Sequence, residues 1–419
     1  MTTLALIALL VLLLLLRQPL LVLLGTALVW VYATAGSDHP SFILLDGWHA
    51  LNRDVLLSIP LFILSGQIMA QGAMAKRLVR FVGALTGPIP GGMAIATVLA
   101  CALFAAISGS STVTLLAVGS VMYPALLSAG YSRSFALGAL CAAGTLGIIV
   151  PPSIPLILYG VMTRVSITDL FIAGIGPALV LTALLSSYAV VRNWDRRGGS
   201  WDGKEIVESL REGIWSLLMP VIILGGIYSG HFTATESAAV AVVYALIVEM
   251  LIHRELDGKR VFEVVGETTR LLGSLFPVLM LAVSLNVFLT YEEIPQQVVA
   301  WFTEQFETPE GFLLTGNLFL LLVGTVMDIG SAVLILAPML APVAAAQGID
   351  AVHFGIVMIV NLEIGYLTPP FGLNLIVAMG AFKEDFGTIC RAVVPFLLIM
   401  LVGLAAVTLV PAISLFLLG

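Results

Sequence analysis

The segment GTLGIIVPPS, residues 144–153, interrupts one long apolar stretch of the chain, and the segment EIGYLTPP, residues 363–370, interrupts another. A proline inside a helix removes a backbone hydrogen bond and clashes with the preceding turn, at a cost of about 3 kcal/mol. Two prolines in succession, with glycines nearby, therefore predict a helix that opens at this point. Pro151 and Pro369 are 369 − 151 = 218 residues apart, so the same break is expected twice in one chain.

The composition is that of a membrane protein. Of the 419 residues, 60% are hydrophobic and 10% are charged, and the mean hydropathy is +1.10. Apolar runs of about 17 to 25 residues match the thickness of a bilayer, and the alternating pattern of an outer-membrane barrel is absent. We therefore predict an all-α polytopic membrane protein. The net charge of −7 is dispersed without a basic block, so no nucleic-acid partner is expected.

The chain reads as two copies of one unit. The shift of 218 residues also carries Pro124 onto Pro342 and Pro177 onto Pro395. We predict a first repeat over residues 1–210 and a second over 211–419, joined by a cytoplasmic linker from about 192 to 211.

Loop charges indicate that the second copy is inverted. Lysine and arginine accumulate on cytoplasmic loops. Residues 73–93 carry three bases and no acid, whereas the equivalent residues 291–311 carry five acids and no base. Equivalent loops should thus face opposite sides of the membrane, as in the inverted repeats of many secondary transporters. The bases are Lys76, Arg77 and Arg80, and the acids are Glu292, Glu293, Glu304, Glu307 and Glu310.

Each copy contains a second interruption, made of small polar residues. Ser108 to Ser111 divide the apolar stretch at about 88–127, and Asp328 to Ser331 divide the one at about 311–345. We interpret both as re-entrant helical hairpins, each followed by a broken helix, at about 133–163 and 352–380. Backbone outside a helix persists at membrane depth only inside protein or beside a cavity. The hairpin tips and the breaks are therefore the candidate sites.

The opened backbone suggests which ligands would bind. Free carbonyl groups suit a cation, and the positive amino end of the following half-helix suits an anion. The serines at the first tip could instead permit close helix packing. Asp328 is the stronger indication of function, because an ionisable group in an apolar segment is costly. Glu236, at the start of a span, and Glu363, in the second break, each have an equally plausible structural role.

Catalytic motifs are missing from the sequence. No GxxxxGK[ST], GxGxxG or GxSxG pattern occurs, and the histidines and cysteines lack metal-ligand spacing. The protein is therefore not expected to be an enzyme or to hydrolyse ATP, and uphill transport would have to draw on an ion gradient.

Four stretches resemble the large membrane subunit of TRAP transporters, the DctM family of the ion transporter superfamily. They are SGSSTVTLLAVGSVMYPALLSAGYSRSFALGALCAAGTLGIIVPPSIPLILYG at 108–160, TATES at 233–237, APMLAP at 337–342 and HFGIVMIVNLEIGYLTPPFGLNL at 353–375. The resemblance implies an elevator-type transporter of a bacterial or archaeal inner membrane, with separate transport and scaffold domains. It also implies Na⁺-driven symport of a carboxylate.

The resemblance further implies site residues. A first Na⁺ site would involve Ser108, Gly109, Ser110, Gly147 and Pro151, and a second Asp328, Gly330, Gly365, Thr368 and Pro369. Candidates for the substrate are Thr145, Pro152, Ser153, Asn361, Pro370 and Asn374, and Glu236 is a further candidate without an assigned ligand.

Two protein partners follow from the same resemblance. One is a small four-span membrane subunit, expected as a separate chain, and the other is a periplasmic binding protein that delivers the organic acid anion. The alternative is a stand-alone Na⁺/carboxylate symporter of the same superfamily. A channel or a membrane scaffold is a more distant possibility.

Overall fold

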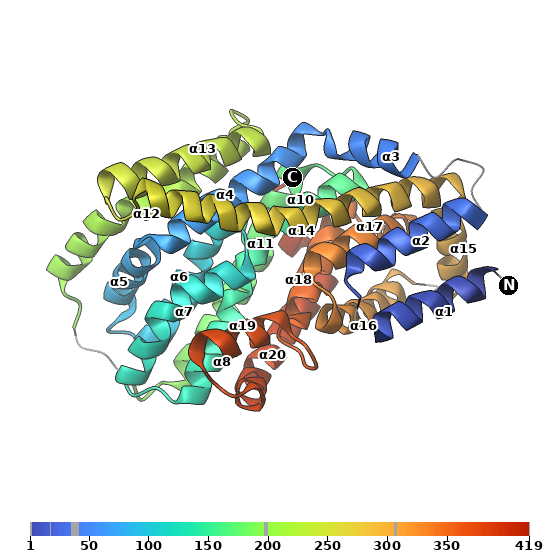
Figure 1. Ribbon diagram of the computed structural model, residues 1–419. Helices are drawn as coiled ribbons and strands as arrows, with labels where there is room; N and C mark the ends of the chain where they lie inside the picture. The colour runs from blue at the N-terminus through green and yellow to red at the C-terminus, as the bar shows by residue number, and fades with distance from the viewer. Residues whose placement is uncertain (1, 17, 35–41, 197–199, 306–307, 419) are drawn as a thin grey trace.

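The computed structural model describes residues 2–16, 18–34, 42–196, 200–305 and 308–418. Glu307, which contributes to the loop charges, lies outside these residues. The regular structure of the described residues is entirely helical (Figure 1). Ten helical segments among them are long and apolar enough to cross a membrane. The predicted all-α polytopic fold is thereby confirmed.

The first half contains a broken helix. Its parts are α8, α9 and α10, which follow the hairpin of α6 and α7. The bounds are α1 Thr2–Leu15, α2 Leu20–Thr34, α3 Phe42–Leu51, α4 Ser58–Gln71, α5 Met74–Thr86, α6 Gly92–Ser108, α7 Ser111–Ser128, α8 Arg133–Gly144, α9 Leu146–Ile149, α10 Ile154–Thr163 and α11 Ile167–Arg192.

The second half has a hairpin, α16 and α17, and a broken helix, α18 and α19. Its helices are α12 Gly203–Tyr228, α13 Ala234–Leu246, α14 Gly258–Tyr291, α15 Ile294–Gln305, α16 Pro309–Val326, α17 Ile329–Ala346, α18 Ala351–Gly365, α19 Leu373–Phe382, α20 Phe386–Leu409 and α21 Ala412–Leu415. A π-helical turn, Ile247–Ile252, extends α13. A shift of 218 residues carries α7 onto α17.

The expected boundary at residues 210 and 211 falls inside α12. This helix begins at Gly203, because Asp202 accepts hydrogen bonds from the backbone N–H groups of Lys204 and Glu205. Arg80 of α5 holds the first turns of α12 through Glu205, at 2.8 Å, and through Glu212, at 2.6 Å. The connection between the halves therefore ends at Asp202, earlier than the predicted linker.

The core contains the broken helices. Every residue of α18 from His353 to Gly365 is buried, and so is every residue of α8 from Phe135 to Gly144. The longest helix, α14, crosses the molecule in Figure 1 and contacts α2, α3, α4 and α17. At 1.5 Å per residue its 34 residues extend about 51 Å. The arms α8 and α18, which lead into the two breaks, are thus enclosed by the other helices.

Candidate functional site

The first hairpin turns at Gly109. Helix α6 ends at Ser108, Gly109 adopts a left-handed φ of 57°, and Ser110 precedes α7 in an extended conformation. Hydroxyl groups bridge the turn, because Ser108 Oγ lies 2.7 Å from Thr114 Oγ1 and Ser110 Oγ lies 3.2 Å from Thr112 Oγ1. The serines at this tip thus belong to a local hydrogen-bond network.

The first break opens the helix after α9. Val150 is extended, the Pro151–Pro152 peptide bond is cis, and α10 starts at Ile154. Ser153 caps α10, since its Oγ accepts a hydrogen bond from Leu156 N at 3.4 Å. The proline pair therefore ends one helix and lets a new amino end form inside the protein.

The first tip packs directly on the first break. A Cβ added to Gly147 would lie 2.4 Å from Ser110 O, and one added to Gly109 would lie 2.8 Å from Pro152 O. Only glycine permits this approach of the two backbones. The carbonyl oxygens of Ser110 and Pro152 consequently lie at the contact between tip and break, where a cation would find ligands of the kind it prefers.

The second tip is built around Asp328. Helix α16 ends at Val326, and Asp328 caps α17 by accepting a hydrogen bond at Oδ2 from Ser331 N at 2.8 Å. A shift of 218 residues carries Ser110 onto Asp328, so the same position precedes the second helix of each hairpin. In the second copy this position carries an exposed carboxylate.

The second break packs on the second tip. The Gly324 and Gly365 backbones touch, with a Cβ on Gly365 only 2.5 Å from Gly324 Cα. Gly372 N donates to Thr325 O at 3.4 Å.

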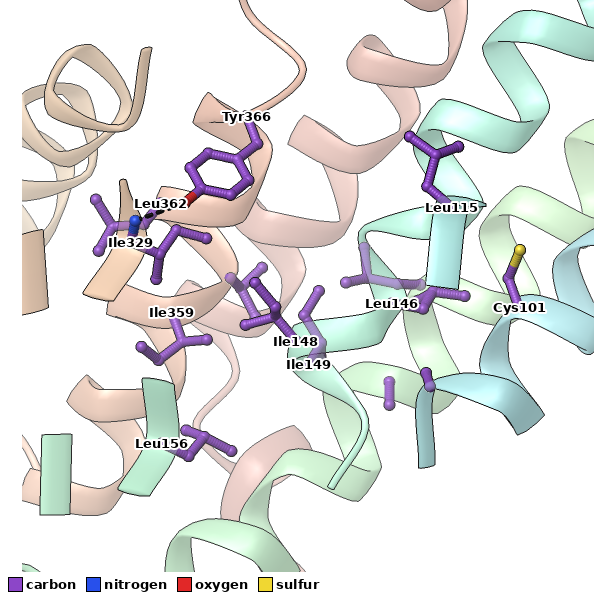
Figure 2. Close-up of a cluster of buried hydrophobic side chains, with 14 of the residues drawn as sticks. Cys101, Leu115, Leu146, Ile148, Ile149, Leu156, Ile329, Ile359, Leu362 and Tyr366 are labelled. Carbon is purple, nitrogen blue, oxygen red and sulfur yellow. Dashed lines mark hydrogen bonds between the residues drawn. The ribbon is translucent and has the colours of Figure 1, made fainter. Parts of the chain in front are cut away.

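Tyr366 Oη accepts a hydrogen bond from Ile329 N at 2.7 Å, the contact drawn in Figure 2. Thr368 Oγ1 donates to Ile364 O, and the cis pair Pro369–Pro370 is exposed.

One cavity of about 650 Å³ adjoins both tips. Of the predicted site residues, it is lined by Gly109, Ser110, Asp328 and Gly330. Such a volume lies within the range of small-molecule sites. The cavity thus joins candidate residues of both halves, although they are 218 or more residues apart in the sequence.

Four helix beginnings border this cavity. Ser110 precedes α7, Ile154 starts α10, Ile329 starts α17 and Leu373 starts α19, and all four residues line the cavity. Helix amino ends carry partial positive charge, which favours a bound anion. Asp328 is the one acidic residue of the described lining. The cavity therefore combines an acid with several positive helix ends.

The polar candidates for substrate binding do not line the cavity. Thr145, Ser153, Asn361 and Asn374 have no exposed surface. Thr145 Oγ1 donates to Ala142 O at 2.6 Å, and Asn361 Nδ2 donates to Asn317 O at 3.0 Å. Pro152 and Pro370 are also outside the lining. None of these six candidates therefore lines the cavity.

A buried polar cluster connects the two halves, and the sequence did not predict that its members contact one another. Asn374 Nδ2 donates to Ser111 Oγ and, at 3.5 Å, to Glu363 Oε1. Glu363 is fully buried, and its Oε2 has no hydrogen-bond partner among the described residues. An acid in an apolar helix was the available signal. The phenol of Tyr366 had no comparable signal, because aromatic residues are common in membrane helices.

Glu236 lies at a helix start. Its Oε2 accepts hydrogen bonds from Thr233 N at 2.8 Å and from Thr233 Oγ1 at 2.9 Å, and Glu236 N donates to Thr233 Oγ1 at 3.2 Å. The two residues form a capping box for α13. Glu236 is not part of the cavity lining.

Known proteins match the chain over most of its length. Residues 6–413 match the family described as tripartite ATP-independent periplasmic transporter, DctM component. The C4-dicarboxylate TRAP transporter large permease protein DctM of Pseudomonas aeruginosa is 44% identical over 86% of this chain and 85% of its own length. The isethionate TRAP transporter permease protein DctMQ of Oleidesulfovibrio alaskensis is 36% identical over 96% of this chain, which spans 64% of that relative.

A solved transporter shares the fold. The YdaH transporter of Alcanivorax borkumensis superposes with a TM-score of 0.61 over 88% of this chain and 86% of the solved one. The two sequences are 14% identical, so this likeness concerns the arrangement of helices alone.

Proposed function

Because the chain belongs to the DctM family of TRAP transporter large permease subunits, we propose that it carries an organic acid anion, a carboxylate in the first instance, into the cell together with Na⁺. The family places the protein in the bacterial inner membrane as a multi-pass subunit, not an enzyme. The substrate class and the coupling ion are the parts of this assignment that go beyond family membership.

The observation that carries the proposal is the convergence of four helix amino ends on the cavity between the tips. An acid anion placed there would meet the partial positive charge at the amino ends of α10, α17 and α19. Binding would need no arginine inside the cavity. The names of the relatives add support, since one is named for C4-dicarboxylates and the other for isethionate, which are both acid anions.

Na⁺ is the proposed partner cargo, at two places. At the first tip the carbonyl oxygens of Ser110 and Pro152 lie where tip and break meet. At the second, the Asp328 carboxylate lies at the cavity. Cation binding at these places would hold each tip against its break and so fix the helix ends that bind the anion. Without the cation, anion affinity should be low.

Movement would follow an elevator mechanism. The hairpins and broken helices would form a transport domain that slides against a scaffold and carries anion and cations across the membrane together. The repeat of helix bounds between the halves supports this mechanism, since an inverted repeat supplies one tip and one break for each side of the membrane.

Two partners complete the proposed system. A small four-span subunit would enlarge the scaffold, and a periplasmic binding protein would deliver the substrate. The relative named DctMQ supports the first partner, because this chain matches 64% of its length and leaves room there for further membrane helices.

Uptake into proteoliposomes tests the proposal. The chain would be reconstituted with its small subunit, and a panel of labelled organic acids would be offered with and without an inward Na⁺ gradient and the binding protein. We expect Na⁺-dependent uptake only with the binding protein. Equal uptake without that protein would indicate a stand-alone symporter, and uptake indifferent to Na⁺ would exclude the proposed coupling.

A further inference from the structure

Two arginines lie together outside the cavity between the tips. Arg53 precedes the short helix Asp54–Leu57, and Arg164 ends α10 in a left-handed conformation with a φ of 61°. Both side chains are exposed. Both line the same two cavities, of about 300 and 580 Å³, which also share Val161. Two arginines 111 positions apart in the sequence thus border the same two cavities.

The surroundings of the arginines leave their charges available. No aspartate or glutamate is among the described residues that line these two cavities. In the described part of the chain neither arginine forms an ion pair, and Arg53 Nη1 donates only a long bond, 3.5 Å, to Val161 O. Asn286 and Thr290 of α14 supply further polar side chains. Guanidinium forks beside neutral polar groups suit a carboxylate.

Helices connect this place to the cavity between the tips. Leu158 of α10 lines the cavity between the tips, here called the tip cavity, and Arg164 lines the two cavities that it shares with Arg53, here called the arginine cavities. About 9 Å of helix separates Leu158 from Arg164. On α14, Val278 lines the tip cavity and Asn286 lines one of the arginine cavities, about 12 Å further along the helix. The arginines therefore lie roughly two helical turns beyond the tip cavity, along helices that wall both.

Their side of the membrane matches the direction of the proposed uptake. Arg164 also lines a third cavity, with Pro295 and Gln296 of α15. Helix α15 lies in the acidic segment 291–311, which the loop charges predict to face outward. An anion arriving from outside would meet the arginines before the tip cavity.

A purely structural role explains only part of this arrangement. A cation at the end of α10 complements the dipole of that helix, which accounts for Arg164. Arg53 is on another segment, so helix capping gives no reason for it to share two cavities with Arg164. Contact with lipid phosphate at the membrane surface is the remaining structural explanation, and the experiment below separates it from substrate binding.

We propose that Arg53 and Arg164 form an entry site that holds the carboxylate of an organic acid at the outer mouth, before the acid reaches the cavity between the tips. The proposal rests on the proposed uptake of acid anions from outside. It adds a second anion site that uses guanidinium groups, whereas the tip cavity uses helix ends.

Chemical protection tests the site without relying on transport. The purified permease would be treated with phenylglyoxal, which modifies arginine, in the presence of succinate or lactate, and modified peptides would be quantified by mass spectrometry. We expect succinate or lactate to lower modification of Arg53 and Arg164 at least threefold while Arg391, exposed on α20, is unaffected. Protection should persist in the Asp328→Ala variant. Protection by phosphatidylglycerol vesicles but by neither acid, or no protection at all, would overturn the proposal.

Kinetics of reconstituted transport provide the second test. Loss of a charge-assisted hydrogen bond weakens binding about tenfold or more. In Arg53→Gln and Arg164→Gln, the half-saturating substrate concentration should therefore rise about tenfold while the maximal rate stays within twofold, and Lys variants should recover part of the loss. Arg391→Gln is the matched control. An unchanged half-saturating concentration in both Gln variants would exclude an entry site even if Na⁺-driven uptake is intact. If the parent shows no Na⁺-driven uptake, the proposed coupling fails, and the chemical protection experiment alone decides whether the entry site exists.

Discussion

Asn374, four residues after the second proline pair, donates a hydrogen bond from Nδ2 to Ser111 Oγ at the first hairpin tip. The two residues are 263 positions apart and belong to different halves of the chain. Asn374 Nδ2 also lies 3.5 Å from Glu363 Oε1. A movement of either tip relative to the opposite break would have to change this buried contact.

The contact between Asn374 and Ser111 should be energetically coupled. Removing either partner leaves a buried polar group unsatisfied, at about 1–3 kcal/mol. We therefore expect Asn374→Ala and Ser111→Ala each to lower thermal stability, and the double variant to lose less than the sum of the two. Thermal unfolding of the parent, the two single variants and the double variant in detergent would measure this double-mutant cycle. Additive losses within about 0.5 kcal/mol would show that the contact contributes nothing of its own.

Gly147→Ala should separate the first tip from its break. The added Cβ would lie 2.4 Å from the carbonyl oxygen of Ser110, so one of the two backbones must shift. We expect loss of most Na⁺-dependent uptake and a lower melting temperature. Gly380→Ala is the control, because a Cβ there meets no atom within 4 Å, and alanine is favoured in a helix by about 1 kcal/mol. Equal behaviour of the two variants would contradict the close packing of tip and break.

Much of the fold follows from local sequence signals. The prolines at 151–152 and 369–370 and the polar residues at 108–111 and 328–331 mark helix ends because their effects on the backbone are local. The start of α12 was misjudged because the charged residues after Asp202 resemble a loop. In the structure they form the first turns of a helix that pairs with Arg80.

Side-chain direction was harder to predict than helix ends. The sequence places Ser153 and Asn374 at the breaks, but only packing determines that both are buried outside the cavity lining. The approach of Tyr366 to Ile329 likewise depends on how α16 crosses α18 at Gly324 and Gly365. Such contacts between distant segments have no signature in a single sequence.

Tyr366→Phe tests whether the phenol supports the second tip. The substitution removes the acceptor of the Ile329 N–H group, which is buried at the start of α17. We expect a loss of about 1–3 kcal/mol of stability. The Na⁺ concentration for half-maximal uptake should rise several-fold. Tyr244→Phe serves as the control, since Tyr244 Oη donates to Trp215 O and neither residue lines the cavity. A Tyr366→Phe variant as active and stable as the parent would refute the role of the phenol.

Glu236→Ala should affect folding and leave transport intact. Breaking the capping box of α13 should cost about 0.5–2 kcal/mol. Because Glu236 does not line the cavity, the rate of uptake per folded molecule should stay within twofold of the parent. Glu236→Gln can keep the box and should restore stability. Loss of uptake in folded Glu236→Gln protein would instead assign the carboxylate a functional role.

Asp328 has two separable roles, and a pair of variants distinguishes them. Its Oδ2 caps α17 through Ser331 N, and its charge faces the cavity. Asparagine is an equally good cap but carries no charge, so Asp328→Asn should keep stability within about 0.5 kcal/mol while the Na⁺ concentration for half-maximal uptake rises at least tenfold. Asp328→Ala should lose the cap as well and unfold more easily, by about 1 kcal/mol. Uptake by Asp328→Asn with unchanged Na⁺ dependence would show that the charge of Asp328 is not needed. Asp328 would then be a helix cap and not part of the proposed cation site.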